Sequence, residues 1–142
     1  MKRLLSILLV ATMMFTFMVP AAFAAGGPTA SVTSASAKVG ETVTVTISIN
    51  GLNEAVTNAE LKVSADSALT LIDLDPANLP GSVIANPTSG KVIFAHTDPV
   101  SVSTLAVATF RVDANAASGD YYVYATVSGM RNGQGQRVSV NS

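Results

Sequence analysis

The sequence predicts an all-β fold, in which two antiparallel sheets pack face to face as a sandwich. Three observations predict it. Apolar and polar residues alternate along several short segments, and Gly, Pro and Asn separate these segments at regular spacing. No apolar repeat of helical period persists for about ten residues beyond the N-terminal segment, as a helix would need. A packed pair of sheets is the arrangement that buries many short strands of this kind.

The first 24 residues have the pattern of a secretory signal peptide. Lys2 and Arg3 precede an apolar run over residues 4–19, and Ala22 to Ala24 provide the small residues that precede a cleavage site. The run is shorter than the roughly 20 residues that a membrane-spanning helix needs. We therefore expect a signal peptide over 1–24, a short flexible lead over 25–29, one domain over 30–142, and no membrane span after cleavage.

The composition limits which environment and which partners are expected for the mature chain. The chain has no cysteine, so an exported form is held by its core and not by disulfides. Without Lys2 and Arg3 the eight basic residues fall to six against nine acidic ones, a net charge of −3. Nucleic acid is not expected as a partner, because phosphate binding needs clustered Lys and Arg. These features favour a secreted, extracellular protein of a bacterium.

The first strands are defined by alternation. A short strand is expected over residues 29–34, and residues 42–50 alternate strictly, with Val and Ile facing inward and Thr and Ser facing outward. Residues 56–63 place Ala59, Leu61 and Val63 on the core side and Asn58, Glu60 and Lys62 on the other side.

Gly, Pro and Asn turns delimit the remaining segments. Residues 76–81 and 129–135 are expected to be loops, because they are rich in Pro or Gly. The alternating segments between the turns predict strands over residues 70–74, 82–85, 91–97, 104–112, 120–128 and 137–140.

Apolar residues on outward strand faces indicate a binding surface. Ile93, Ala95 and Thr97 face away from the core if Phe94 faces it, and Val107 does the same in the strand over 104–112. We expect these two strands to flank the polar row of Asn58, Glu60 and Lys62. A polar row alone is typical of a solvated sheet face. Exposed apolar side chains beside it favour a protein-binding face instead.

The order of these features resembles the cohesin domain of cellulosomal scaffolding proteins over residues 30–140. The matching stretches are 39–43 (VGETV), 57–61 (TNAEL) followed by Asp66 and Leu69, 90–94 (GKVIF) leading to Asp98, 105–112 (LAVATFRV) and 117–121 (ASGDY). The resemblance implies a nine-stranded jelly roll that binds, without catalysis, the dockerin modules of enzymes in polysaccharide-degrading complexes.

The resemblance also implies roles for single residues. Asn58 and Glu60 match the Asn and Asp through which many cohesins hydrogen-bond dockerin helices, although Glu is one methylene longer. Ala95 and Thr97 match apolar contact positions on a neighbouring strand. Two departures stand out: Asp66 is not followed by proline, and the sequence stops near the expected closing strand. Either that strand is missing, or the sequence is a fragment of a longer scaffold.

Other readings of the sequence remain open beside this one. Tyr122 and Tyr124 share a strand face and could stack on sugar rings, as in a carbohydrate-binding or adhesive module that binds polysaccharide. His96 lies near Asp98, but no nucleophile motif accompanies it, so an enzyme is not expected. Asp73 and Asp75 alone offer too few oxygens for calcium. No cofactor and no metal site is predicted.

Overall fold

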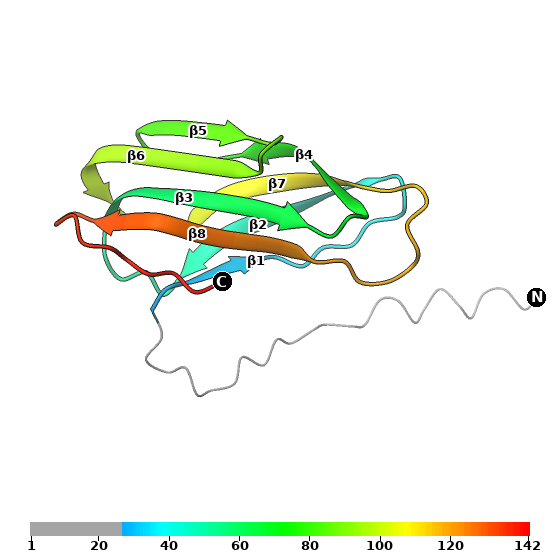
Figure 1. Ribbon diagram of the computed structural model, residues 1–142, viewed down its shortest axis with the longest axis horizontal. Coiled ribbons are helices and arrows are strands. Elements are labelled where there is room, and N and C mark those ends of the chain that lie inside the picture. Colours follow the sequence, from blue (N-terminus) through cyan, green and yellow to red (C-terminus); the bar gives the residue numbers. More distant parts are fainter. Residues whose placement is uncertain (1–26) are drawn as a thin grey trace, which may run out of the picture.

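A computed structural model describes residues 27–142 of the protein (Figure 1). The predicted signal peptide and the first residues of the expected lead lie outside the described residues. Residues 27–142 form strands and no helix, and hence no helix there could cross a membrane. The strands are β1 (Thr29–Val32), β2 (Thr42–Asn50), β3 (Val56–Ala65), β4 (Leu69–Asp75), β5 (Ser82–Asn86), β6 (Lys91–Val100), β7 (Thr104–Val112) and β8 (Val123–Asn132).

Two four-stranded sheets form the sandwich. Their strand orders are β1-β2-β7-β4 and β5-β6-β3-β8, and every strand pair is antiparallel. The chain passes from one sheet to the other in the connections β2–β3, β3–β4, β4–β5, β6–β7 and β7–β8. The two layers lie one behind the other in Figure 1. The all-β sandwich with jelly-roll connections is thus confirmed, although residues 27–142 form eight strands and not the nine that the resemblance implied.

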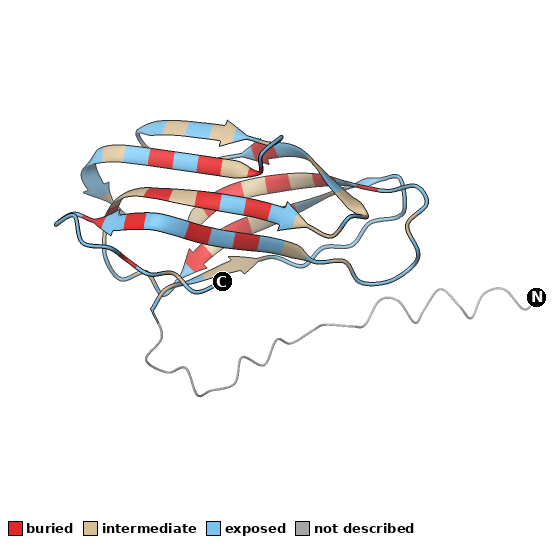
Figure 2. Ribbon diagram, viewed as in Figure 1, coloured by how far each residue is buried: buried red, intermediate tan, exposed pale blue. Residues whose placement is uncertain are grey.

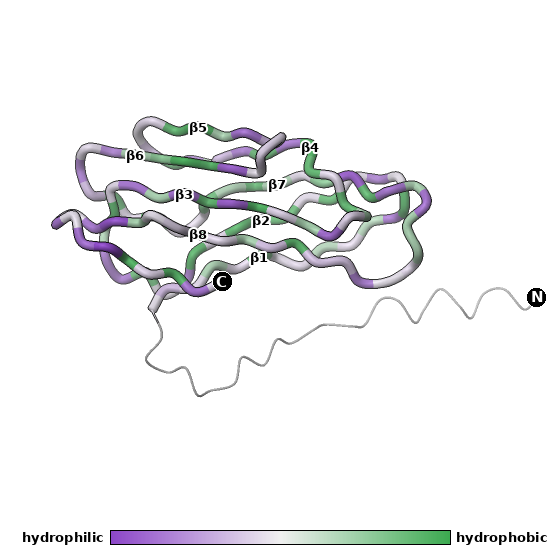
Figure 3. The backbone as a smooth tube through the Cα atoms, viewed as in Figure 1, coloured by the Kyte–Doolittle hydropathy of each residue, from purple (hydrophilic) through white to green (hydrophobic). Residues whose placement is uncertain are grey.

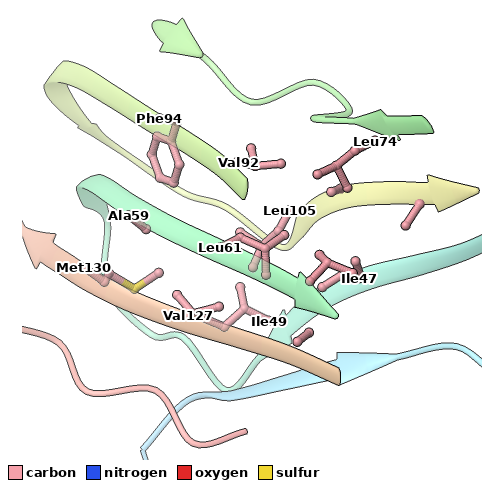
Figure 4. Packing of buried hydrophobic residues seen from close by; sticks show 14 of the residues in the cluster. Ile47, Ile49, Ala59, Leu61, Leu74, Val92, Phe94, Leu105, Val127 and Met130 are labelled. Carbon is pink, nitrogen blue, oxygen red and sulfur yellow. The ribbon is translucent and has the colours of Figure 1, made fainter. Parts of the chain in front are cut away.

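The core lies between the two sheets and is supplied by alternate residues of each strand. Buried and exposed residues alternate along β2, β3, β6 and β8 (Figure 2). Phe94 of β6 and Phe110 of β7 are the largest fully buried side chains, and Ile47 of β2 packs in the same cluster (Figure 4). This alternation fixes which side chains can face outward, and so it determines the site.

The end of β8 is held by one buried amide, that of Asn132. Its Nδ2 donates to Glu54 Oε2 at 2.9 Å and to Gln136 Oε1 at 3.0 Å. Its Oδ1 accepts from the backbone N–H groups of Gln134 at 3.1 Å and Gln136 at 2.9 Å. The hydrophilic stretch that follows β8 turns back at this end of the molecule (Figure 3). Sequence patterns did not reveal this network, because Glu54, which lies just before β3, is 78 residues away from Asn132 in the sequence.

The predicted bounds fail around β8. The strand begins three residues later than expected and continues through Gly129, which was assigned to a loop. Gly129 has a φ of 63°, and the pairing of β3 with β8 slips there by one residue. It is therefore part of a bulge, a place in a strand where glycine is favoured.

No strand forms over residues 137–140. Instead, Asn141 makes a parallel bridge with Thr29 at the edge of β1. The Asn141 N–H donates to the Pro28 carbonyl at 2.8 Å, and the Ala30 N–H donates to the Asn141 carbonyl at 2.8 Å. Val138 is buried against the core. The segment thus lies along the sandwich without forming the predicted strand.

Candidate functional site

The outward side chains of β5, β6, β3 and β8 form one surface, which we call the front face. The register places Glu60 directly opposite Ile93, and Asn58 directly opposite Ala95. Ile93 in turn lies opposite Ile84 of β5. The predicted neighbours Ile93 and Ala95 are therefore beside the polar row of β3, as expected.

Thr97 lies at the margin of this arrangement. It is exposed, but β6 is irregular here: β3 advances by two residues between Val56 and Asn58 while β6 advances by five, from Ala95 to Val100. Thr97 therefore has no partner in β3. Lys62, in contrast, continues the polar row as predicted and lies opposite Lys91.

Val107 does not belong to the front face, and the prediction that its strand flanks β3 was wrong. β7 lies in the other sheet, where Val107 pairs with Thr46 of β2 and Asp75 of β4. Its side chain lies on the outer surface of that sheet, which we call the back face. Alternation shows which side of its own sheet a residue occupies, but it does not show in which sheet the strand lies.

Asn58 is held in place by its neighbours. Its Nδ2 donates to the Gly129 carbonyl at 2.7 Å, and the Thr57 hydroxyl donates to its Oδ1 at 3.2 Å. The bulge in β8 thus supplies the acceptor that orients the amide. A half-buried side chain that is already fixed loses less conformational entropy when it binds a partner.

Glu60 is paired within the face. Its Oε1 lies 3.0 Å from Lys91 Nζ, and the two side chains are 35% and 42% exposed. An ion pair this exposed contributes about 0–1 kcal/mol to stability. Lys91 was not predicted as a site residue, because the pairing depends on the register of β6 against β3.

A shallow, open hollow of about 440 Å³ lies between β3 and β6. Thr57, Asn58, Glu60, Ile93, Ala95 and His96 are among the residues that line it. Asn58 and Glu60 supply its polar side, and Ile93 and Ala95 supply its apolar side. The hollow is too open to enclose a small molecule, and its mixed lining is typical of a protein interface.

Ile84 extends the apolar part of the front face. It is 67% exposed and lies next to Ile93, which is 40% exposed. The strand over residues 82–85 was predicted, but Ile84 was not singled out. The sequence did hold a signal for it: Ile84 lies between Val83 and Ala85, and since these two residues face the core, Ile84 must face outward.

Tyr122 and Tyr124 lie at the far end of the same front face, each 52% exposed. Tyr124 is opposite Ser64 of β3. Asp66 joins both tyrosines to the end of β3: its Oδ2 accepts from the Tyr122 N–H at 2.8 Å, and its Oδ1 accepts from the Tyr124 hydroxyl at 3.2 Å. Desolvation and the Asp66 carboxylate raise the pKa of the Tyr124 hydroxyl above its ordinary value of about 10.0.

The other chemical candidates have local partners. The Asp98 N–H donates to His96 Nδ1 at 3.1 Å, within one turn of the chain. Asp75 Oδ1 accepts from the Ala77 N–H at 2.9 Å. Among residues 27–142, no three His, Asp or Glu side chains are grouped closely enough to hold a metal ion.

Comparison with known structures gives similar cohesins. The seventh ScaB type I cohesin of Pseudobacteroides cellulosolvens matches with a TM-score of 0.67 and 20% identity, over 81% of this chain and 85% of that one. The sixth cohesin of scaffoldin B from Acetivibrio cellulolyticus, solved in complex with a mutant Cel5 dockerin, gives 0.63 and 18%, over 82% and 99%. A non-cellulosomal cohesin from the hyperthermophilic archaeon Archaeoglobus fulgidus gives 0.56 and 21%, over 82% and 86%.

At these identities the structural matches establish the fold alone. No protein of curated function matches the sequence significantly. The model of the cohesin domain family matches residues 28–142, nearly all of the described chain. The chain therefore belongs to the cohesin domain family.

Proposed function

We propose that this protein is a secreted, non-catalytic binding module whose front face docks a dockerin module carried by an enzyme that degrades polysaccharide. The observation that carries the proposal is the pairing of fixed polar groups with exposed apolar ones. Asn58 and Glu60 lie directly opposite Ala95 and Ile93, and all four line one open hollow.

The chemistry of the front face suits a protein partner. Its polar groups are already oriented: Asn58 by the Gly129 carbonyl and Glu60 by Lys91. Its apolar side chains, Ile84 and Ile93, are exposed side by side. Interfaces typically combine an apolar centre with polar groups that fix orientation, and pre-oriented groups reduce the entropy lost on binding.

The relatives support the identity of the partner. The cohesin from A. cellulolyticus was solved together with a dockerin. The archaeal relative is described as non-cellulosomal, so family membership supports a dockerin partner more directly than it supports a cellulosome. Secretion is supported by the pattern of residues 1–24, in which an apolar run follows two basic residues and precedes Ala-Phe-Ala.

A capture experiment tests the proposal. The immobilised domain is incubated with culture supernatant of the producing organism, and bound proteins are identified by mass spectrometry. The wild type is expected to recover dockerin-bearing proteins, and the Asn58→Ala/Glu60→Ala double variant is expected to bind the same dockerin at least about tenfold more weakly. The matched control is Thr44→Ala/Thr109→Ala, which removes an exposed polar pair, 3.2 Å apart, from the back face.

Two results would count against this function. One is equal recovery of the same dockerin-bearing proteins by the wild type and the Asn58/Glu60 variant. The other is recovery of no dockerin-bearing protein by a wild-type domain whose folding is verified by circular dichroism. The control variant is expected to bind as the wild type does.

A second candidate is a carbohydrate-binding or adhesive module, which the exposure of Tyr122 and Tyr124 on one face favours. Two aromatic side chains are a small platform for stacking on sugars, and the Tyr124 hydroxyl is engaged by Asp66. Sedimentation of the isolated domain with insoluble cellulose, lost in Tyr122→Ala/Tyr124→Ala, would favour this candidate over docking.

A further inference from the structure

The front face is less acidic than the rest of the domain. Residues 27–142 contain six basic and nine acidic side chains. Lys62, Lys91 and Arg131 lie on or beside the front face, on β3, β6 and β8. Glu60 is the acidic side chain in its centre, and Asp98 is exposed toward the end of β6. Asp66 lies at the end of the face, where the Tyr122 N–H and the Tyr124 hydroxyl occupy its two oxygens. Basic charge is thus concentrated locally, where Lys62 and Lys91 face each other at the opposite end of the paired β3 and β6 segments from Asp98.

One of the lysines has no counter-charge. Lys62 and Lys91 lie directly opposite each other on neighbouring strands, an arrangement of like charges that destabilises a sheet. Glu60 pairs with Lys91 at 3.0 Å, and this is the single ion pair among residues 27–142. Lys62 is exposed and has no carboxylate within ion-pair distance in the described chain. Like charges on directly opposite strand positions are locally unfavourable, and unfavourable arrangements of this kind are expected at functional sites.

The apolar pair lies close to this lysine. Ile84, Ile93 and Glu60 form one cross-strand row, and Lys91 and Lys62 form part of the next. Neighbouring strands are about 4.8 Å apart and residues two apart in a strand about 6.6 Å, so Ile93 and Lys62 are roughly 8 Å apart. Side chains one to two turns apart on a helix of about 5.4 Å pitch can span this distance.

On the basis of the proposed docking function, we propose that the partner is an acidic dockerin surface. It presents an Asp or Glu carboxylate to Lys62, and one to two helical turns away it places an apolar side chain against Ile84 and Ile93. The carboxylate neutralises the ammonium that Glu60 leaves unpaired. A partner with Lys or Arg at that position is repelled by Lys62 and Lys91, so this pair of lysines selects among dockerins.

Charge exchange tests the inference. The probe is a dockerin recovered by the capture experiment above, made as the natural protein and as a series of variants, each with one exposed helix carboxylate replaced by Lys. Each carboxylate exposed on the dockerin helices is replaced in turn. Affinities are measured by isothermal titration calorimetry against the wild-type domain, Lys62→Met, Lys62→Glu and the control Arg111→Glu. Arg111 is an exposed strand residue of the back face, so its reversal makes the same change of charge away from the site.

For the natural dockerin, Lys62→Glu is expected to weaken binding about 10- to 100-fold, and Lys62→Met to weaken it less. One of the Lys-substituted dockerins should regain affinity for Lys62→Glu, and added salt should weaken the wild-type complex. Arg111→Glu should change little.

The inference is overturned if Lys62→Glu binds the natural dockerin as well as, or better than, the wild type while the Asn58/Glu60 variant still binds weakly. It is also overturned if no Lys-substituted dockerin regains affinity. If the wild type binds no dockerin at all, the proposed function itself fails, and this inference fails with it.

Discussion

Replacement of Asn132 by alanine tests whether the buried amide at the end of β8 holds this part of the fold. The side chain is 6% exposed and makes four hydrogen bonds, one of them to the Glu54 carboxylate. A hydrogen bond to a charged group contributes about 1.5–3 kcal/mol, and a neutral one about 0.5–1.5 kcal/mol. The partners Glu54, Gln134 and Gln136 are exposed, so water can replace part of what is lost.

We expect the free energy of unfolding to fall by about 2–3 kcal/mol in Asn132→Ala. For a domain of this size, 1 kcal/mol corresponds to about 4 °C, so the melting temperature should fall by about 8–12 °C. Urea denaturation followed by circular dichroism measures the first quantity, and calorimetry measures the second. Asn132→Asp keeps the acceptor but places a second carboxylate beside Glu54, so it should be at least as destabilising.

The matched control is Asn50→Ala. Asn50 is exposed and makes a single side-chain hydrogen bond, from its Nδ2 to Ser31 Oγ at 2.8 Å. Its loss should cost under about 1 kcal/mol. If Asn132→Ala destabilises the domain no more than Asn50→Ala does, the amide network does not hold the end of β8, and the reasoning is wrong.

Two further predictions concern the front face. Gly129→Ala should lower stability by about 1 kcal/mol, because alanine is strained at a φ of 63°. It should also weaken dockerin binding, because it displaces the carbonyl that orients Asn58. Gly129→Asn should weaken binding less, since Asn tolerates this backbone region. If the two variants bind the dockerin with equal affinity, the role of Gly129 in orienting Asn58 is contradicted. Desolvation and the hydrogen bond to Asp66 raise the pKa of Tyr124, so the protonated hydroxyl stabilises the fold below about pH 10, and this contribution is lost as the pH rises through the pKa of the folded state. Urea unfolding of the wild type and Tyr124→Phe should therefore differ at neutral pH and converge in strong alkali, and a gap that widens with pH would refute this.

The sequence predicted the strands whose two sides differ most in polarity. The bounds expected for residues 42–50 and 104–112 are those observed for β2 and β7. Alternation also assigned Asn58 and Glu60 to the outer side of β3 correctly, because a period of two leaves only two choices for each side chain.

What sequence patterns could not give is the pairing between strands that are distant in the chain. Val107 was grouped with Asn58 because both face outward, although β7 and β3 lie in different sheets. The Lys91–Glu60 pair and the approach of Glu54 to Asn132 depend on register and on loop paths, which a single sequence does not encode locally. Gly129 was taken as the start of a loop because glycine marks turns and bulges alike.

The back face has a practical use that follows from the sandwich. Thr44 lies exposed near the start of β2, on the opposite side of the molecule from Asn58, and the chain contains no cysteine. A single cysteine introduced there would therefore be the sole thiol, available for attachment to a bead, a sensor chip or a fluorophore. Such a tether would orient every molecule alike, with the Asn58 side turned toward the solution.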